Sequence, residues 1–161
     1  MAITDIADIA DSLPASGRLL GLDLGTKTIG LAVSDSALSI ASPIGTVQRK
    51  GFETDMRALQ DAMKGRDIAG LILGYPVNMD GTEGPRAKAT LDFAERLTGE
   101  IDLPIALWDE RLSTRAVERA MIEADMSRKR RSKKVDAAAA AFILQGAIDY
   151  LRASASRGPR L

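Results

Sequence analysis

The fold of this chain is decided by residues 17–35, which read GRLLGLDLGTKTIGLAVSD. Two apolar runs flank a turn of glycine, threonine and lysine, a pattern that predicts two antiparallel strands with a short connection. Asp23 lies inside the first run, where an ionised carboxylate is unfavourable unless it pairs with a cation, bonds to the turn or binds a metal. Asp23 therefore either bonds to the turn or to Lys27, or it belongs to a site that needs further carboxylates.

The composition of the chain excludes several kinds of chemistry. Its 161 residues include no Cys and no His, which removes thiol nucleophiles, histidine dyads and the usual zinc ligands. The 22 basic and 22 acidic residues give a net charge of +0, so any attraction to nucleic acid has to come from a local cluster. We expect a cytoplasmic protein without membrane contact, because no apolar segment is long enough to span a bilayer and the first residues are acidic where a secretory signal is basic.

The periodicity of apolar residues along the chain predicts an α/β fold. Residues 3–13 have the spacing of an amphipathic helix that ends at Pro14. Strands are predicted at 18–24, 29–35, 38–48, 69–75 and 103–111, and helices at 52–65, 85–98, 113–126 and 135–154. From residue 18 onward the order β-β-β-α-β-α-β-α predicts a ribonuclease H-like mixed sheet with helices on both faces. We expect an N-terminal extension over 1–16, one domain over 17–152 and a flexible tail over 153–161.

Three further acids are candidates for a site shared with Asp23. Asp136 lies on the helical stripe of the apolar residues four, seven and eleven positions further on, although an acid in the first turn of a helix is also stabilised by the helix dipole. Asp109 and Glu110 end an apolar strand and face opposite ways, so only one of them points at the site. The alternative for Glu110 is a surface ion pair with Arg111. We favour Glu110, whose longer side chain reaches further, and assign Asp109 to support.

Carboxylates gathered without a histidine require a cation, because they cannot otherwise all be ionised. Oxygen ligands suit Mg²⁺ or Mn²⁺, and two such ions about 4 Å apart activate water and stabilise the leaving oxygen in phosphodiester hydrolysis. A basic run directly precedes Asp136 and is either a solvated loop or a clamp for a phosphate backbone. Its basic residues are Arg128, Lys129, Arg130, Arg131, Lys133 and Lys134.

Four motifs occur in a fixed order along residues 18–150: LLGLDLGTKTIGLAVSD, LILGYPVNMDGTEGPRA, DERLST and VDAAAAAFILQ. Together they resemble the YqgF (RuvX) family of ribonuclease H-like proteins, which implies a nuclease that matures the 5′ end of pre-16S ribosomal RNA. The resemblance implies Asp23 as metal ligand of the first strand, Glu110 or Asp109 as the central acid and Asp136 as the acid of the last helix. It also implies that Asn78 and the turn at 81–82 border the site.

The hypothesis is therefore a nuclease that uses Asp23, Glu110 and Asp136 to bind Mg²⁺ or Mn²⁺. Lys27, Asn78 and Arg111 are expected to contact the substrate together with the basic run. Pre-ribosomal RNA is the expected partner, and the chain is expected to act as a monomer or homodimer.

Three alternatives to this hypothesis stay open at this point. A Holliday junction resolvase would use the same chemistry on branched DNA. A noncatalytic ribosome-assembly factor would bind RNA through the basic run alone. An ATP-binding phosphotransferase built on the turn at 23–26 would need a second domain, which 161 residues do not supply.

Overall fold

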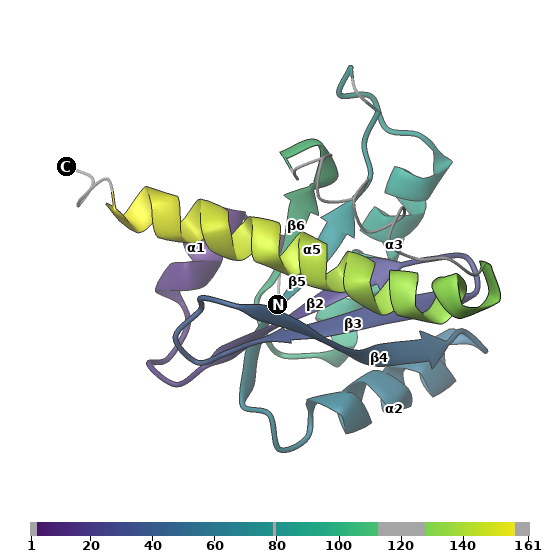
Figure 1. Cartoon of the computed structure of the whole chain (residues 1–161), viewed down its shortest axis with the longest axis horizontal. Coiled ribbons are helices and arrows are strands. Elements are labelled where there is room, and N and C mark those ends of the chain that lie inside the picture. Colours follow the sequence, from purple (N-terminus) through teal and green to yellow (C-terminus); the bar gives the residue numbers. More distant parts are fainter. Residues whose placement is uncertain (1–2, 79, 113–127, 157–161) are drawn as a thin grey trace.

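The computed structural model describes residues 3–78, 80–112 and 128–156, with the backbone alone described at 112, 128–136 and 155–156. The elements in chain order are β1 (Ile3–Thr4), α1 (Ile6–Asp11), β2 (Arg18–Leu24), β3 (Thr28–Ser34), β4 (Ala41–Gln48), α2 (Phe52–Met63), β5 (Ile68–Tyr75), α3 (Pro85–Glu100), β6 (Ile105–Asp109), the 3-10 helix η1 (Glu110–Leu112) and α5 (Arg128–Ser156). Figure 1 shows α5 lying across the sheet that these strands form.

The six described strands form one mixed sheet in the order β1-β6-β5-β2-β3-β4. β2, β3 and β4 are antiparallel neighbours, whereas β2 pairs with β5 and β5 with β6 in parallel. The prediction of a mixed sheet with helices on both faces is thereby confirmed. Because β2, β5 and β6 run in the same direction, their carboxyl ends meet at one edge of the sheet.

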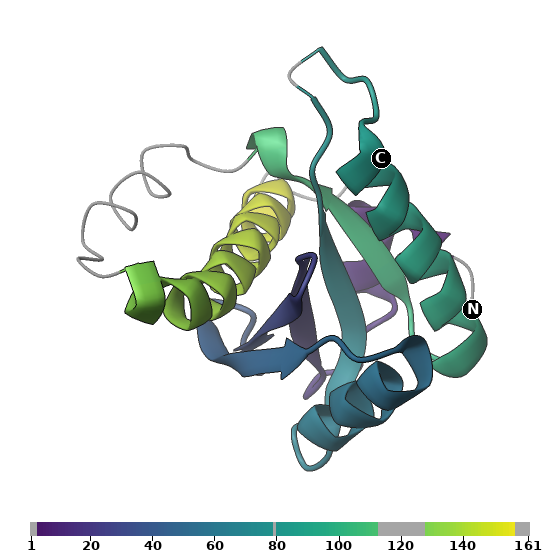
Figure 2. The same ribbon diagram turned by 90° about the vertical axis from the view of Figure 1, so that its right-hand side faces the viewer.

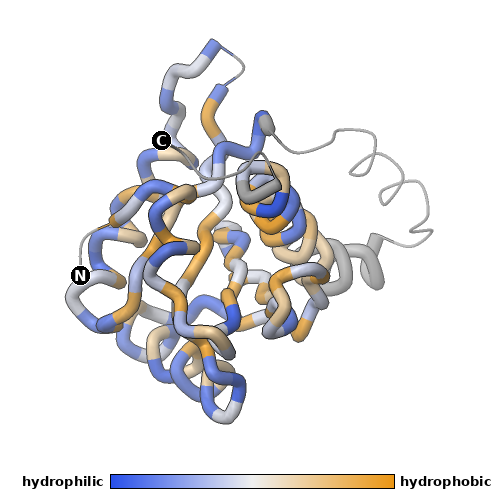
Figure 3. Tube along the Cα trace, turned by 90° about the vertical axis from the view of Figure 1, so that its left-hand side faces the viewer, coloured by the Kyte–Doolittle hydropathy of each residue, from blue (hydrophilic) through white to orange (hydrophobic). Residues whose placement is uncertain are grey.

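Two apolar cores lie on opposite faces of the sheet, as Figure 2 shows with α5 on one side and α2 and α3 on the other. Leu20, Leu22 and Leu24 of β2 pack on the side of α2 and α3, whereas Leu19 packs on the side of α5. Gly21 also faces α5, since a methyl group there would lie 2.8 Å from Cβ of Leu144. The alternation of side chains therefore assigns every second residue of β2 to α5. Figure 3 shows hydrophobic stretches concentrated inside the molecule.

The ends of the chain differ from the prediction. Instead of one helix over 3–13, residues 3–4 form a strand that pairs in parallel with β6, and only Ile6–Asp11 is helical. Strand pairing with a distant partner outweighs local helical spacing here, because the apolar pattern of two residues cannot distinguish the two states. At the other end the helix continues to Ser156, so residues 153–156 of the expected tail are helical.

The basic run is also placed differently from the prediction. Helix α5 begins at Arg128, so residues 128–134 form its first turns and are not a loop before it. Arginine and lysine are good helix formers, and neither glycine nor proline interrupts the run. The helix predicted over 113–126 lies outside the described residues. Within the described part of the chain, none of the helices combines the length and apolar character that a membrane crossing requires.

Candidate active site

The candidate site lies at the shared carboxyl edge of β2, β5 and β6. Asp23 is half-buried near the end of β2 and, two residues after Gly21, has its place on the face covered by α5. The parallel registers pair Leu22 with Leu73 and Gly74 with Trp108, so Gly74 comes next to Asp23 in the neighbouring strand. A residue without a side chain thus stands between Asp23 and β6.

Glu110 places its carboxyl group beside Gly74. A methyl group on Gly74 would lie 3.3 Å from the carboxyl carbon of Glu110 and 2.5 Å from Cδ1 of Ile143 in α5. Both contacts are on the α5 face, which is the face of Asp23. Gly74 is therefore the gap between two carboxylates, and a larger residue there would fill it.

Asp109 is held by Arg111 at the end of β6. The Arg111 side chain donates from Nε to Asp109 Oδ1 and Oδ2 at 3.0 Å each and from Nη2 to Oδ2 at 2.6 Å, and the Arg111 backbone N–H donates to Oδ1 at 2.9 Å. These hydrogen bonds, aided by the positive charge, hold the pKa of Asp109 below its usual range. Glu110 opens η1 and is not a strand residue, so its position follows from the turn at the end of β6 as well as from strand alternation.

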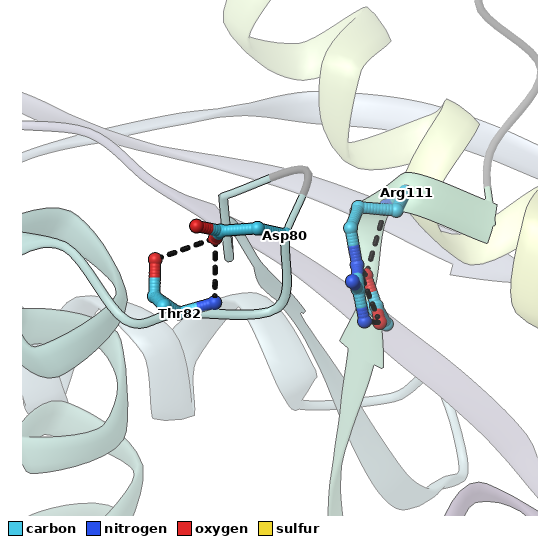
Figure 4. A network of polar contacts seen from close by, with 4 residues as sticks. Asp80, Thr82 and Arg111 are labelled. Carbon is cyan, nitrogen blue, oxygen red and sulfur yellow. Dashed lines mark hydrogen bonds and ion pairs between the residues drawn. The ribbon is translucent and has the colours of Figure 1, made fainter.

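The loop between β5 and α3 stands beside Arg111, as Figure 4 shows. Asp80 accepts hydrogen bonds from the backbone N–H and the hydroxyl of Thr82, which lower its pKa, with a smaller contribution from the charge of Arg111. Gly81 has φ +89°, and a methyl group there would lie 3.4 Å from Nη1 of Arg111. Asn78 donates from Nδ2 to Thr82 Oγ1 at 3.0 Å, so its amide helps to close this loop.

Tyr75, which directly follows Gly74, was not singled out from the sequence. Burial raises the pKa of its phenol to about 12, with further contributions from a hydrogen bond to Glu83 and from the charges of Glu83 and Asp109. The phenol therefore remains protonated throughout the physiological pH range and donates its hydrogen bond to Glu83. Gly74 was missed as well, although a glycine inside a buried strand is a recognised sign of close approach by another group.

The other sequence-predicted residues are placed as follows. Lys27 is exposed in the turn after β2, and its pairing with Asp23 stays a prediction. The backbone of Asp136 lies in α5 one turn before Ala140, whose carbonyl oxygen would be 3.1 Å from a methyl group on Gly21. The side chains of Asp136 and of the basic run lie outside the described ones.

The described carboxylates do not by themselves form a complete metal site, because no group of three or more potential ligands occurs among the described residues. Asp23 and Glu110 supply two oxygen donors on one face of the sheet. A third donor from α5 is required, and the sequence offers Asp136 near the position where the backbone of α5 passes over Gly21. The residues present therefore fit an oxygen-coordinated divalent cation provided that α5 contributes.

Comparisons with known proteins agree with this architecture. The chain is 56% identical to the "Putative pre-16S rRNA nuclease" of Rhodospirillum centenum, over 94% of this chain and 84% of that protein. It is 58% identical to the protein of the same name from Rhodobacter capsulatus, over 89% of this chain and 91% of that protein. The solved structure of T. thermophilus RuvC in complex with Holliday junction substrate matches with a TM-score of 0.55 at 12% identity, covering 90% of this chain and 99% of that one.

The fold is thus ribonuclease H-like, as the order of elements predicts. The family model described as "RuvX: Holliday junction resolvase" matches residues 17–150. This range includes Asp23, Glu110 and every strand of the sheet except β1. The chain therefore belongs to the RuvX family.

Proposed function

We propose that this protein is a metal-dependent endonuclease that processes the 5′ end of pre-16S ribosomal RNA. The observation that carries the proposal is the pair of acids, Asp23 in β2 and Glu110 directly after β6, which share one face of the sheet on either side of Gly74 in the intervening strand β5. Support for the substrate comes from the relatives at 56% and 58% identity that bear the name of pre-16S rRNA nuclease.

Asp23, Glu110 and Asp136 would hold Mg²⁺ or Mn²⁺. A divalent cation in a nuclease site activates water and neutralises charge that develops on the leaving oxygen. The chain has no histidine or cysteine, so its donors are oxygen atoms, which these cations prefer. Trp108, which pairs with Gly74 in the register of β6, and Ile143, which packs near Gly74, are almost fully buried on the same face, and electrostatic interactions are stronger beside such an apolar surface.

Asp109 and Arg111 serve the site as positioning residues in this proposal. Their bidentate ion pair fixes the first residues after β6, and Glu110 lies between them in the chain. Arg111, Lys27 and Asn78 stand at the rim where they can contact the substrate backbone. The basic run at 128–134 lies in the first turns of α5 and would bind phosphates beside the site.

The test is cleavage of a precursor RNA that carries the 5′ extension, with and without Mg²⁺ or Mn²⁺. Glu110→Gln should abolish cleavage and keep RNA binding, because it removes a transition-state interaction and leaves ground-state contacts. Asp109→Asn is the matched control: it alters the neighbouring acid and should cost less. Full loss in Asp109→Asn with a nearly silent Glu110→Gln would reverse the two roles, and cleavage by both variants at the wild-type rate would refute the proposal.

Branched DNA is the second candidate substrate, because the family model bears the description of a Holliday junction resolvase. The chemistry at Asp23 and Glu110 would be identical, so only the substrate distinguishes the two functions. Four-way junctions and precursor RNA are therefore compared side by side at equal enzyme concentration. Cleavage of the junction alone would replace the RNA proposal with the resolvase function. If a variant that lacks all three acids still binds RNA, and the 5′ end of the ribosomal RNA still matures normally, the protein is a noncatalytic factor.

A further inference from the structure

A basic hollow of about 300 Å³ lies on the face of the sheet that α2 and α3 cover, opposite to the face of Asp23 and Glu110. It lies between the turn after β2, the start of α2 and the middle of α3, and three of its lining residues are Arg49, Lys50 and Arg96. We propose that this hollow, called here the Arg49 hollow, binds a phosphate group of the nucleic-acid backbone. The inference rests on the proposed function and extends it from the acids to a second contact with the same substrate.

Two of the three cations are held in place by aromatic rings. The Arg96 guanidinium carbon lies 3.8 Å from the ring centroid of Phe52, and that of Arg49 lies 5.8 Å from the centroid of Phe93. The two rings meet edge to face with centroids 5.9 Å apart. A guanidinium over a ring keeps N–H donors at its edges for an anion, and its conformational freedom is already reduced before a ligand binds.

The positive charge of the hollow is not neutralised from within. Among the described residues, neither arginine nor Lys50 makes an ion pair with a carboxylate. The one acid in the lining, Asp55, is 3% exposed and accepts the backbone N–H of Lys50 at 2.9 Å, so it serves the start of α2. The N-cap of α2 is Gly51 and has no side-chain cap, which adds unsatisfied backbone N–H groups and the positive end of the helix dipole.

The hollow is joined to the candidate active site through the turn after β2. Arg49 donates from Nη1 to the carbonyl of Gly25 at 2.6 Å and from its backbone N–H to the carbonyl of Lys27 at 2.9 Å. Thr26, which lines the hollow, is three residues after Asp23, at most about 10 Å of extended chain. A nucleic-acid backbone that reaches Asp23 and passes over the exposed Lys27 therefore arrives at the hollow, which suits a phosphodiester better than an apolar or cationic ligand.

The test compares two double variants that remove the same charge. Lys50→Gln with Arg96→Gln removes two cations of the hollow, and Arg57→Gln with Lys88→Gln removes two exposed cations that do not line it. Arg49 is left intact because it braces the turn. Binding of fluorescein-labelled single-stranded precursor RNA is measured by anisotropy between 50 and 200 mM salt, and folding by thermal melting.

The hollow variant should bind RNA about two- to thirtyfold more weakly, as expected for two phosphate contacts at an exposed surface. Its log–log salt slope should fall in magnitude by about 1.4, or about 0.7 for each contact with a single strand. The control variant should match the wild type, and cleavage at saturating RNA should stay within about twofold in both. The single variant Lys50→Gln, at an exposed position outside the helices, gives half of the slope change if the double variant folds poorly.

Other outcomes separate this inference from the proposed function. Equal affinity and slope in the hollow and control variants would overturn the inference while wild-type cleavage stands. If the wild-type protein binds RNA without cleaving it, and the hollow variant binds RNA more weakly while the control variant does not, the proposed nuclease function is overturned and phosphate binding in the Arg49 hollow is supported. Pyrophosphate tests whether the ligand is a free phosphate instead of a nucleic-acid backbone. If pyrophosphate binds the wild type at the hollow, and the salt dependence of RNA binding is the same in the hollow variant as in the wild type, the ligand is a free phosphate and the inference is wrong.

Discussion

Replacement of Gly74 by alanine tests whether the gap between Asp23 and Glu110 is required for activity. The added methyl group would lie 2.5 Å from Cδ1 and 3.1 Å from Cγ1 of Ile143, and 3.3 Å from the carboxyl carbon of Glu110. The first distance is too short for any real contact, so the Ile143 side chain has to move. Ile143 is 3% exposed and has little room to do so.

The expected loss of stability follows from two opposing effects. Overpacking of a core costs about 1–3 kcal/mol. Alanine in place of glycine at a position without positive φ returns about 0.4–1 kcal/mol by restricting the unfolded chain, and Gly74 is not among the positive-φ glycines. The net loss in the free energy of unfolding is about 0–2.6 kcal/mol, which lowers Tm by at most about 10 °C for a domain of this size.

Activity should fall more than this loss of stability explains. The Glu110 carboxyl has to shift by a few tenths of an ångström. Because a misplacement of about 1 Å can cost about 100-fold in rate, we expect cleavage to drop severalfold, up to about tenfold, at a temperature where the variant is folded. Adding Ile143→Val removes the atom in the 2.5 Å contact. The double variant should therefore recover stability relative to the sum of the single changes, but not cleavage, because the contact with Glu110 remains.

Gly70→Ala is the matched control on the same strand and the same face. A methyl group there would lie 3.1 Å from Cδ1 of Ile9 and from Cδ2 of Leu19, contacts that are longer than the 2.5 Å contact at Gly74 and do not involve Glu110. It should lower Tm less than Gly74→Ala does and leave cleavage nearly unchanged. Wild-type cleavage by Gly74→Ala, an equal loss in Gly70→Ala, or recovery of cleavage with Ile143→Val would refute the role assigned to the gap.

Two further predictions concern a metal ion and pH. Mg²⁺ or Mn²⁺ at about 100 times its Kd should stabilise the wild type by about 2.7 kcal/mol in a thermal melt and Asp23→Asn not at all, and an equal shift in both would place the ion elsewhere. The Asp35 carboxyl accepts hydrogen bonds from Ser39 and Ile40, which lower its pKa to about 2. Because the pKa of Asp35 is depressed in the folded state, the stabilisation from its carboxylate is present above about pH 4 and is lost toward pH 2. Asp35→Asn should therefore be less stable than the wild type at pH 7, and denaturant titrations should show this difference in the free energy of unfolding closing between about pH 4 and pH 2. A difference that stays constant with pH would contradict this origin.

The sequence by itself determined the central architecture, because each element there carries its own local signal. The alternating and continuous apolar runs predict β2, β3, β5 and β6, and the three- and four-residue spacing predicts α2 and α3. A carboxylate inside a strand run marks Asp23 as unusual before any partner is known. The family motifs then indicate the chemistry that the relatives' names support.

Only the tertiary structure decided features that depend on contacts between distant segments. The pairing of residues 3–4 with β6, the position of Glu110 beside Gly74 and the approach of Arg49 to the turn after Asp23 each join residues far apart in the chain. The start of α5 at Arg128 was missed for another reason: a charged run of good helix formers has no apolar stripe, so its periodicity does not report its conformation. Local patterns record the burial of each segment, whereas the partner against which a segment is buried is set by the packing of the whole sheet.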